Sequence, residues 1–380
     1  MPEARSRPAW AEVDLDAITA NTRAIGDVVA PAQVCAVVKA NGYGHGADDA
    51  ARAALRGGAT RLGVALAEEG VALRKAGVEA PVLLLSQPSA AAMADVVRYD
   101  LTPTLYSPRA ISALAAAAKR PGVTVPVHAK VDTGMHRVGA ETDVAVALAV
   151  QIAETPGLEL EGFYTHLAVS EDLARTAVTD AALDRFDAAV EKLLAQGVTP
   201  RLLHAANSGG AIGHPRSRYD MVRVGIALYG YPPGPDLAAR VALTPAMQLK
   251  ARVTHVQHLG AGEGISYGLR YVTERPTVIA TLPLGYADGV PRALSQSPGA
   301  AVLVGGRPCP IAGMITMDQL MVDCGPESTV EPGDEVVLLG TQGDETITAE
   351  DWAQRLGTIS YEVLCGIGPR VPRRVHGAHE

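Results

Sequence analysis

Residues 37–46 read Val37-Val38-Lys39-Ala40-Asn41-Gly42-Tyr43-Gly44-His45-Gly46, an apolar run that ends in a lysine and a glycine-rich turn. With Val34-Cys35-Ala36 before it, the run is apolar on both faces, as parallel strands covered by helices are. A lysine at the end of such a strand is costly unless it is bonded to another group. Covalent attachment to an aldehyde cofactor would remove that cost and make Lys39 a reactive centre.

The same pattern repeats along the chain. Further apolar runs lie near residues 62–66, 82–86, 101–105, 123–131, 158–166, 201–206 and 221–229. Alanine-rich helical stretches separate most of them, such as 47–56, 67–76, 107–119, 142–154 and 177–196. The alternation predicts an α/β fold with an N-terminal (β/α)8 TIM-type barrel. A doubly wound open sheet is the alternative, and the lack of a GxGxxG sequence after the first strand disfavours it.

The character of the chain changes after the Pro- and Gly-rich segment Tyr231–Pro235. Strand patterns then dominate, at residues 250–257, 277–282, 301–304, 320–324 and 335–339. One helix is expected at 349–356, where Thr348 and Asp351 resemble a capping box. We therefore expect a barrel domain at 10–240 and a C-terminal mostly-β domain at 241–380. The N-terminal strand, within residues 1–15, is a candidate to join the second domain.

Composition narrows the class of protein. Of the 380 residues, 48% are hydrophobic and 19% charged, which is ordinary for a globular protein. The net charge of −8 argues against nucleic acid or an anionic membrane as the main partner. The four cysteines are far apart and form no CxxC pair, so we expect neither a disulfide scaffold nor a metal site. No signal sequence is recognisable and no apolar stretch is long enough to span a membrane, so we expect a cytoplasmic protein.

Polar residues at the ends of the expected strands are the candidates for chemistry, because catalytic groups gather at that face of a barrel. Arg137 and Lys130 follow the fifth strand, where a surface ion cluster is the alternative. Ser208 precedes two glycines and can bind a phosphate, or merely cap a helix. Arg223 lies among apolar residues and must be paired or bound to a ligand.

At this point the sequence resembles a known family. The segment from Val37 to Gly46 is similar to the signature around the cofactor lysine of alanine racemases, which use pyridoxal 5'-phosphate (PLP). The resemblance extends over nearly the whole chain, through the blocks 130–137, 163–166, 204–210, 223–226, 264–268, 283–289, 315–319 and 360–362. One small departure is Thr316, where some members of the family carry a cysteine.

The resemblance implies a role for each matching residue. Lys39 would form the Schiff base with PLP, and Lys39 and Tyr267 would be the two catalytic bases. Arg223 would face the pyridine nitrogen, within a cofactor site that also includes Tyr43, His166, His204, Ser208, Gly225, Ile226 and Tyr361. Arg137 would hold the substrate carboxylate, and Met317, Tyr286 and Asp318 would line the substrate side. Lys130 matches a lysine that is often carbamylated in the family.

The implied function is alanine racemase, which interconverts L-alanine and D-alanine and supplies D-alanine for peptidoglycan. Lys39 would act on the D-enantiomer and Tyr267 on the L-enantiomer. Because Tyr267 comes from the partner subunit in the family, the resemblance implies a homodimer with composite sites. A broader racemase, acting on serine or others, stays open. A PLP decarboxylase is disfavoured by Arg223, and a non-catalytic PLP carrier by the β domain with Tyr267.

Overall fold

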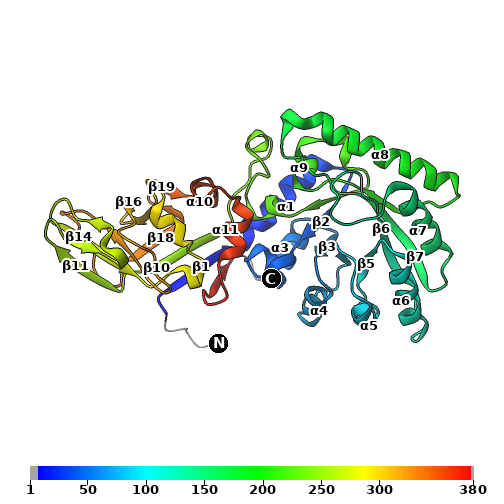
Figure 1. Cartoon of the computed structure of the whole chain (residues 1–380). Helices are drawn as coiled ribbons and strands as arrows, with labels where there is room; N and C mark the ends of the chain where they lie inside the picture. The colour runs from blue at the N-terminus through cyan, green and yellow to red at the C-terminus, as the bar shows by residue number, and fades with distance from the viewer. Residues whose placement is uncertain (1–6, 378–380) are drawn as a thin grey trace. The chain divides into compact units, whose positions relative to one another are not determined.

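A computed structural model describes residues 7–377, and the chain divides into two compact units. One unit is Asp16–Thr244; the other combines the segment up to Leu15 with the chain from Pro245 onward. Residues 1–6 of the expected N-terminal segment and 378–380 of the expected C-terminal domain lie outside the described residues. Figure 1 gives the element labels used below.

The unit Asp16–Thr244 is a nearly closed barrel of eight parallel strands. In chain order they are β2 (Gln33–Val37), β3 (Arg61–Val64), β4 (Val82–Leu84), β5 (Thr102–Leu105), β6 (Val125–Lys130), β7 (Leu158–Tyr164), β8 (Leu202–His204) and β9 (Met221–Val224). Strand β2 pairs with both β3 and β9, so the sheet curls back on itself. Backbone hydrogen bonds from Asp220 to Leu203 (3.0 Å) and from Arg223 to Ala206 (2.9 Å) link β9 to β8. The predicted TIM-type barrel is confirmed.

Helices alternate with these strands and, in Figure 1, α6, α7 and α8 lie outside them. They are α1 (Leu15–Val29), α3 (Ala47–Arg56), α4 (Ala67–Lys75), α5 (Met93–Arg98), α6 (Pro108–Lys119), α7 (Thr142–Glu154), α8 (Thr176–Ala195) and α9 (Ser208–Gly213). Helix α6 shows how the sequence starts one: the Ser107 hydroxyl accepts the Ala110 N–H, and Pro108 occupies the first turn. Its buried residues Ile111 and Leu114 have the spacing of one helical face.

Two details of the barrel differ from the prediction. The expected strand 221–229 ends at Val224, because the backbone turns at Gly225 and a 3-10 helix, η4 (Ile226–Tyr229), follows. Helix α5 was not predicted, because its six residues are too few to show a period. Burial of Met93 and Val96 stabilises it instead.

The second unit is mostly β, as predicted. Its larger sheet contains β1 (Ala9–Asp14), β10 (Met247–Arg252), β15 (Ala301–Val304), β16 (Arg307–Pro310), β18 (Glu335–Gln342), β19 (Glu345–Ile347) and β20 (Arg373–His376). A three-stranded sheet contains β11 (His255–Leu259), β14 (Thr277–Leu282) and β17 (Leu320–Asp323), and a small ribbon pairs β12 (Gly264–Ile265) with β13 (Tyr271–Val272). Strand β1 pairs antiparallel with β10 and parallel with β20. Both ends of the described chain therefore contribute to one sheet.

The expected strand 250–257 is wrong, since β10 and β11 are separate strands in different sheets. Between them the Val253 N–H donates to Asp334 and the Thr254 N–H to Thr281, so the chain changes partners there. The predicted helix is confirmed as α10 (Ala349–Leu356), with both capping-box hydrogen bonds between Thr348 and Asp351. A second helix, α11 (Ser360–Gly366), was missed.

Two features are absent from residues 7–377. No helix within residues 7–377 is long and apolar enough to cross a membrane. In the same range, no three His, Cys, Asp or Glu side chains are grouped so as to hold a metal ion.

Candidate active site

Lys39 stands at the carboxyl end of β2, where it begins a short turn labelled α2 (Lys39–Tyr43). The turn is left-handed: φ is +52° at Ala40, +54° at Asn41, +63° at Gly42 and +52° at Tyr43. L-residues pay roughly 1–2 kcal/mol each for this conformation. The sequence predicted a glycine-rich turn after Lys39, but not that three non-glycine residues would share its strain.

Hydrogen bonds from outside the turn hold it in place. The Ala40 N–H donates to Oε1 of Glu69 (2.7 Å), and Oε2 of the same carboxylate accepts the N–H groups of Ala65 (2.8 Å) and Leu66 (3.1 Å). Glu69 therefore ties the turn after β2 to the turn after β3. The role of Glu69 could not be predicted from the sequence, because nothing near it in the chain marks its contact with Ala40, 29 residues away.

Tyr43, Gly225 and Ser208 meet at the ends of β2, β8 and β9. The Tyr43 side chain is buried, and a Cβ at position 225 would collide with its hydroxyl and lie 2.9 Å from Cζ. Only glycine at 225 permits this approach. The Gly225 N–H donates to the Ser208 hydroxyl (3.1 Å), and Ile226 opens the 3-10 helix η4. The hydroxyls of Ser208 and Tyr43 thus both lie beside Gly225, and because the Ser208 oxygen accepts from Gly225, its own proton can be donated to an anion.

Arg223 lies within β9 and is 3% exposed. Its Nη1 donates to Nδ1 of His204 (2.7 Å), and its Nη2 lies 3.1 Å from Nδ1 of His166. Nη2 also donates to the carbonyl oxygens of Thr165 (2.8 Å) and Ala205 (3.0 Å). The buried guanidinium is satisfied by neutral acceptors, and the structure brings the three predicted residues Arg223, His166 and His204 together.

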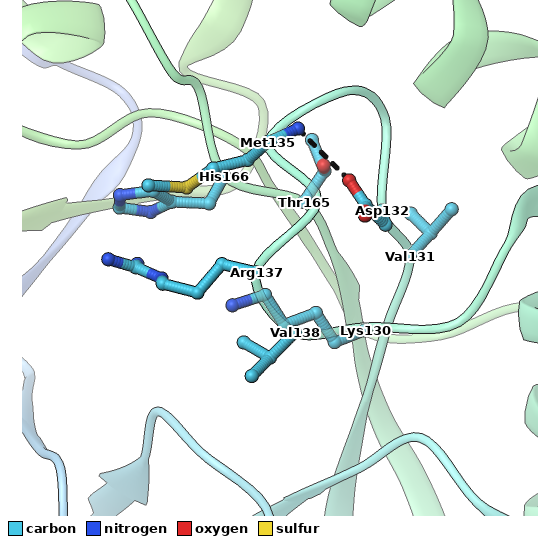
Figure 2. Close-up of a pocket in the computed structure, with 8 residues that line it drawn as sticks. All are labelled: Lys130, Val131, Asp132, Met135, Arg137, Val138, Thr165 and His166. Carbon is cyan, nitrogen blue, oxygen red and sulfur yellow. Dashed lines mark hydrogen bonds between the residues drawn. The ribbon is translucent and has the colours of Figure 1, made fainter.

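A pocket opens beside this arginine, and Figure 2 shows its lining side chains. They come from the end of β6 and its following loop and from the end of β7: Lys130, Val131, Asp132, Met135, Arg137, Val138, Thr165 and His166. In the view of Figure 2 the side chains of Arg137 and His166 extend in the same direction. Arg137, predicted to hold the substrate carboxylate, and His166, predicted to belong to the cofactor site, therefore line one pocket.

Positive charge concentrates around His166. Burial lowers the pKa of its imidazole well below the ordinary value, and nearby cations lower it further. In decreasing order of effect these cations are Arg223, Lys130, Arg137 and Lys39. An uncharged histidine near four basic side chains is typical of a site that binds an anionic ligand.

Lys130 ends β6 and is 5% exposed. Burial lowers the pKa of its amine to about 7, and the charges of Arg223 and Arg137 act in the same direction. Asp132 opposes the shift only in part. A large share of this lysine is therefore uncharged near neutral pH.

Asp132 shapes the loop that carries Arg137. One carboxylate oxygen, Oδ1, accepts the N–H groups of Gly134 (2.9 Å), Met135 (3.0 Å) and His136 (3.1 Å). Burial raises the pKa of this carboxyl, but the backbone hydrogen bonds outweigh it and lower the pKa overall. Burial of Lys130 disfavours the alternative of a surface ion cluster, and the aspartate organises the backbone of the loop.

Five predicted site residues lie in the mostly-β unit. Tyr267 opens the 3-10 helix η6 (Tyr267–Leu269) and is 75% exposed; Tyr286 opens η7 (Tyr286–Asp288). The turn of Tyr286 is bound to the turn of Met317, since the Ala287 N–H donates to the Met317 carbonyl (3.1 Å). Asp318 pairs with Arg370 (2.6 Å). Tyr361, the fifth predicted residue of this unit, lies in the first turn of α11.

Comparison with known proteins adds to this geometry. The family model described as "Alanine racemase, N-terminal domain" matches residues 13–233, and "Alanine racemase, C-terminal domain" matches residues 246–375. The chain belongs to the alanine racemase family. The resemblance found at Lys39 is thereby confirmed, and membership in the alanine racemase family makes the chain an enzyme of the racemase class.

Individual relatives of this alanine racemase family member align over almost its full length. The alanine racemase of Symbiobacterium thermophilum is 48% identical over 367 residues, covering 97% of each chain. The crystal structure of alanine racemase from D-cycloserine producing Streptomyces lavendulae matches with a TM-score of 0.92 and 38% identity, covering 99% of each chain. A histidine racemase from Leuconostoc mesenteroides matches with a TM-score of 0.90 and 28% identity, covering 98% of this chain and 99% of that one.

The roles of several buried residues of this racemase could not be predicted from its sequence. Beyond His204, hydrogen bonds continue to His128 in β6 (2.8 Å) and from there to Glu161 in β7 (3.1 Å). Arg61 in β3 donates to Glu161 through both terminal nitrogens (2.8 and 3.0 Å). A single signal was available: His128 and Glu161 interrupt apolar strands, where unpaired polar groups are costly.

Proposed function

We propose that this chain is an alanine racemase that interconverts L-alanine and D-alanine with PLP held at the mouth of the barrel. The observation that carries the proposal is the buried cation Arg223, hydrogen-bonded to His204 and His166 at that mouth. A ring nitrogen that faces a guanidinium stays unprotonated, because arginine does not give up its proton. Such a ring is a weaker electron sink, which suits an enzyme that only exchanges a proton.

The residues present fit PLP. The hydroxyls of Tyr43 and Ser208 and the backbone around Gly225 and Ile226 supply donors for its phosphate, and the space beside Tyr43 exists only because residue 225 is glycine. TIM barrels commonly bind phosphate after strands seven and eight, where Ser208 and Gly225 lie. We propose that Lys39 carries the cofactor as a Schiff base. PLP, when bound, acidifies the Cα–H of the attached amino acid.

The chain's own residues then orient the substrate and move the proton. Arg137 presents two parallel donors to the substrate carboxylate. Lys39 and Tyr267 act from opposite faces of the substrate carbon, Lys39 on the Cα proton of D-alanine and Tyr267 on that of L-alanine. Inversion needs such a pair, because one group must remove a proton and the other return one. We propose carbamylation of Lys130, favoured by its neutral amine, as a brace for Arg137.

We further propose a homodimer in which the partner subunit contributes Tyr267 with Tyr286, Met317 and Asp318, and in which Tyr361 reaches the cofactor phosphate. Exposure supports this: Tyr267 is 75% exposed, Met317 52% and Tyr286 43%. Large apolar side chains gathered on neighbouring turns are typical of a surface that another chain covers. The proposed cellular role is to supply D-alanine for peptidoglycan from the cytoplasm.

A broader racemase, acting on serine or other amino acids, is the second candidate. It is favoured by the likeness to the Leuconostoc mesenteroides histidine racemase, which has the same fold at a TM-score of 0.90. The fold therefore does not by itself fix the substrate.

Chiral chromatography after incubation with single L-amino acids tests the proposal and separates the two candidates. We expect PLP-loaded protein to form D-alanine much faster than D-serine or D-histidine, and Lys39→Ala to form none. Comparable rates with serine or histidine would favour the broader racemase. Wild-type protein that forms no D-amino acid would contradict both.

A further inference from the structure

A line of hydrogen-bonded side chains crosses the interior of the barrel. It runs from Arg223 in β9 through His204 in β8 and His128 in β6 to Glu161 in β7. The four residues are nearly or fully buried, with exposed fractions of 3%, 0%, 0% and 3% in that order. Beyond the contact of Arg223 with His204, the proposed reaction uses none of these residues directly, so the remainder of the line needs its own explanation.

The chemistry of the groups fixes where each proton lies. A guanidinium only donates, so Nδ1 of His204 must accept from Nη1 of Arg223. A neutral imidazole has one N–H, so Nε2 of His204 carries the proton and donates to Nδ1 of His128. By the same reasoning Nε2 of His128 carries the proton and donates to Oε2 of Glu161. In every hydrogen bond of this line, the donor is the residue nearer Arg223 and the acceptor is the residue nearer Glu161.

Both histidines are neutral in this arrangement. Burial lowers the pKa of His204 well below its ordinary value, and the charge of Arg223 adds to the effect. Burial also lowers the pKa of His128, although its hydrogen bond to Glu161 opposes the shift. A second proton on His128 would force His204 to accept at Nε2 and to turn an N–H towards the guanidinium. Two donors would then face each other.

Glu161 anchors the far end as an acceptor. Burial raises the pKa of its carboxyl, but hydrogen bonds from His128 and Arg61 outweigh burial and lower the pKa to about 2. Arg201 also pairs with Oε1 of this carboxylate. Because two arginines hold it ionised, Glu161 has no proton to donate back to His128.

Neighbouring residues also hold the imidazole rings of His204 and His128 in place. The Tyr164 ring stacks on His204 with centroids 4.4 Å apart and an interplanar angle of 11°. A Cβ at Gly162 would lie 2.7 Å from Cγ of His128, so glycine at this position makes room for the imidazole. Stacking fixes the plane of His204, and the line of hydrogen bonds decides which of its nitrogens faces Arg223.

We propose that Glu161 and His128 are positioning residues, which fix His204 as its Nε2–H tautomer and so keep Nδ1 as the acceptor that orients Arg223. This inference rests on the proposed function only for the reason why Arg223 must be oriented. In that function Arg223 faces the ring nitrogen of PLP. A His204 protonated at Nδ1 would turn an N–H towards the guanidinium and repel it. Arg223 would then lose one of its two hydrogen bonds to histidine.

Histidine tautomers can be read directly from long-range 1H–15N correlation spectra of protein labelled with 15N at histidine. In the wild-type protein, with and without PLP, we expect protonated Nε2 and unprotonated Nδ1 at both His204 and His128. A wild-type His204 protonated at Nδ1 would overturn the proposal, whether or not any variant folds. The spectra do not depend on turnover, so a failure of the proposed function would show separately, as absent racemisation.

Glu161→Gln tests the direction of the line. The amide has one acceptor oxygen. Oε1 of Glu161 accepts from two arginines, Arg61 and Arg201, whereas Oε2 accepts from only one arginine, Arg61, beside His128. The oxygen of the amide should therefore stay at the Oε1 position, and the NH2 group should turn towards His128. We expect His128 to move to the Nδ1–H tautomer and kcat for racemisation to fall by about 10- to 100-fold, with a smaller change in KM. Unchanged tautomers together with wild-type kcat would refute the proposal.

Two further variants distinguish a positioning role of Glu161 and His128 from a general loss of the ion pairs around Glu161. Arg201→Met removes an exposed partner of the same carboxylate without touching His128, so tautomers and kcat should stay as in wild type. Gly162→Ala displaces the His128 ring without changing any charge, so it should perturb the tautomers and lower kcat as Glu161→Gln does. The opposite result, with Arg201→Met altering the tautomers and Gly162→Ala leaving them intact, would mean that charge at Glu161, and not the line of hydrogen bonds, sets His204.

Discussion

Nη1 of the buried Arg223 donates to Nδ1 of His204 over 2.7 Å. The acceptor is a neutral ring and not a carboxylate, so the guanidinium keeps its charge instead of cancelling it in an ion pair. In the proposed enzyme that charge faces the cofactor, and it is what directs the chemistry towards proton exchange.

Arg223→Lys should therefore impair the enzyme although it conserves the charge. An ammonium is a single point donor and cannot bind both histidines and the carbonyls of Thr165 and Ala205 in the planar arrangement that arginine uses. We expect kcat to fall about 100-fold, with the far-UV circular dichroism unchanged. A variant with wild-type kcat would show that the charge suffices without the geometry.

Gly225→Ala should weaken cofactor binding. The added methyl group would collide with the hydroxyl of Tyr43, and both must shift. Absorbance titration with PLP should show at least a tenfold loss of affinity, that is about 1.4 kcal/mol. Gly26→Ala, in the last turn of α1, is the matched control, because a Cβ there meets nothing within 4 Å and should leave PLP binding unchanged. Equal affinities in both variants would place the phosphate elsewhere.

Lys130 should make stability depend on pH in a defined direction. Burial lowers its pKa from 10.5 to about 7. Between these values the unfolded chain binds the proton and the folded chain does not, so the free energy of unfolding rises with pH across this window. Lys130→Met should be more stable than wild type below pH 7, where burial of the charge costs most, and its advantage should shrink as the pH approaches 10.5. Differential scanning calorimetry in buffers free of carbon dioxide would measure this, and a difference independent of pH would contradict it.

Composite sites can be tested by mixing subunits. Lys39→Ala and Tyr267→Phe should each be nearly inactive alone. If Lys39 of one chain works with Tyr267 of the other, each mixed dimer contains one intact site, and a random mixture should recover about a quarter of wild-type activity. If both residues act within one chain, no mixed dimer has an intact site and no activity returns. Size-exclusion chromatography with light scattering would check that subunits exchange.

Much of the fold could be predicted because its signals are local. Apolar runs and alanine-rich stretches alternate within short windows, so strands such as β3 and helices such as α3 stood out at nearly their observed bounds. The end of β9 and the break between β10 and β11 could not be predicted in the same way. Gly225 and Val253–Thr254 stop or redirect a strand because of the partners they meet in space, and local sequence does not carry those partners.

The same distinction between local and long-range signals applies to the residues of the candidate site. Lys39, Arg137 and Ser208 were found because polar residues at strand ends are conspicuous, and the structure does bring barrel residues such as Tyr43, Ser208 and Gly225 together. His128 and Glu161 were missed because each is a single polar residue inside an apolar run. Their role depends on hydrogen bonds between different strands of the barrel, since His128 contacts His204 at a sequence separation of 76 residues.

The most direct test of the central claim follows alanine in deuterium oxide from both starting enantiomers. The enzyme we propose should bring L-alanine and D-alanine separately to the same racemic mixture, with deuterium at Cα of the inverted product, as read by chiral chromatography and mass spectrometry. Consumption of one enantiomer without formation of the other, or inversion without deuterium at Cα, would contradict the account.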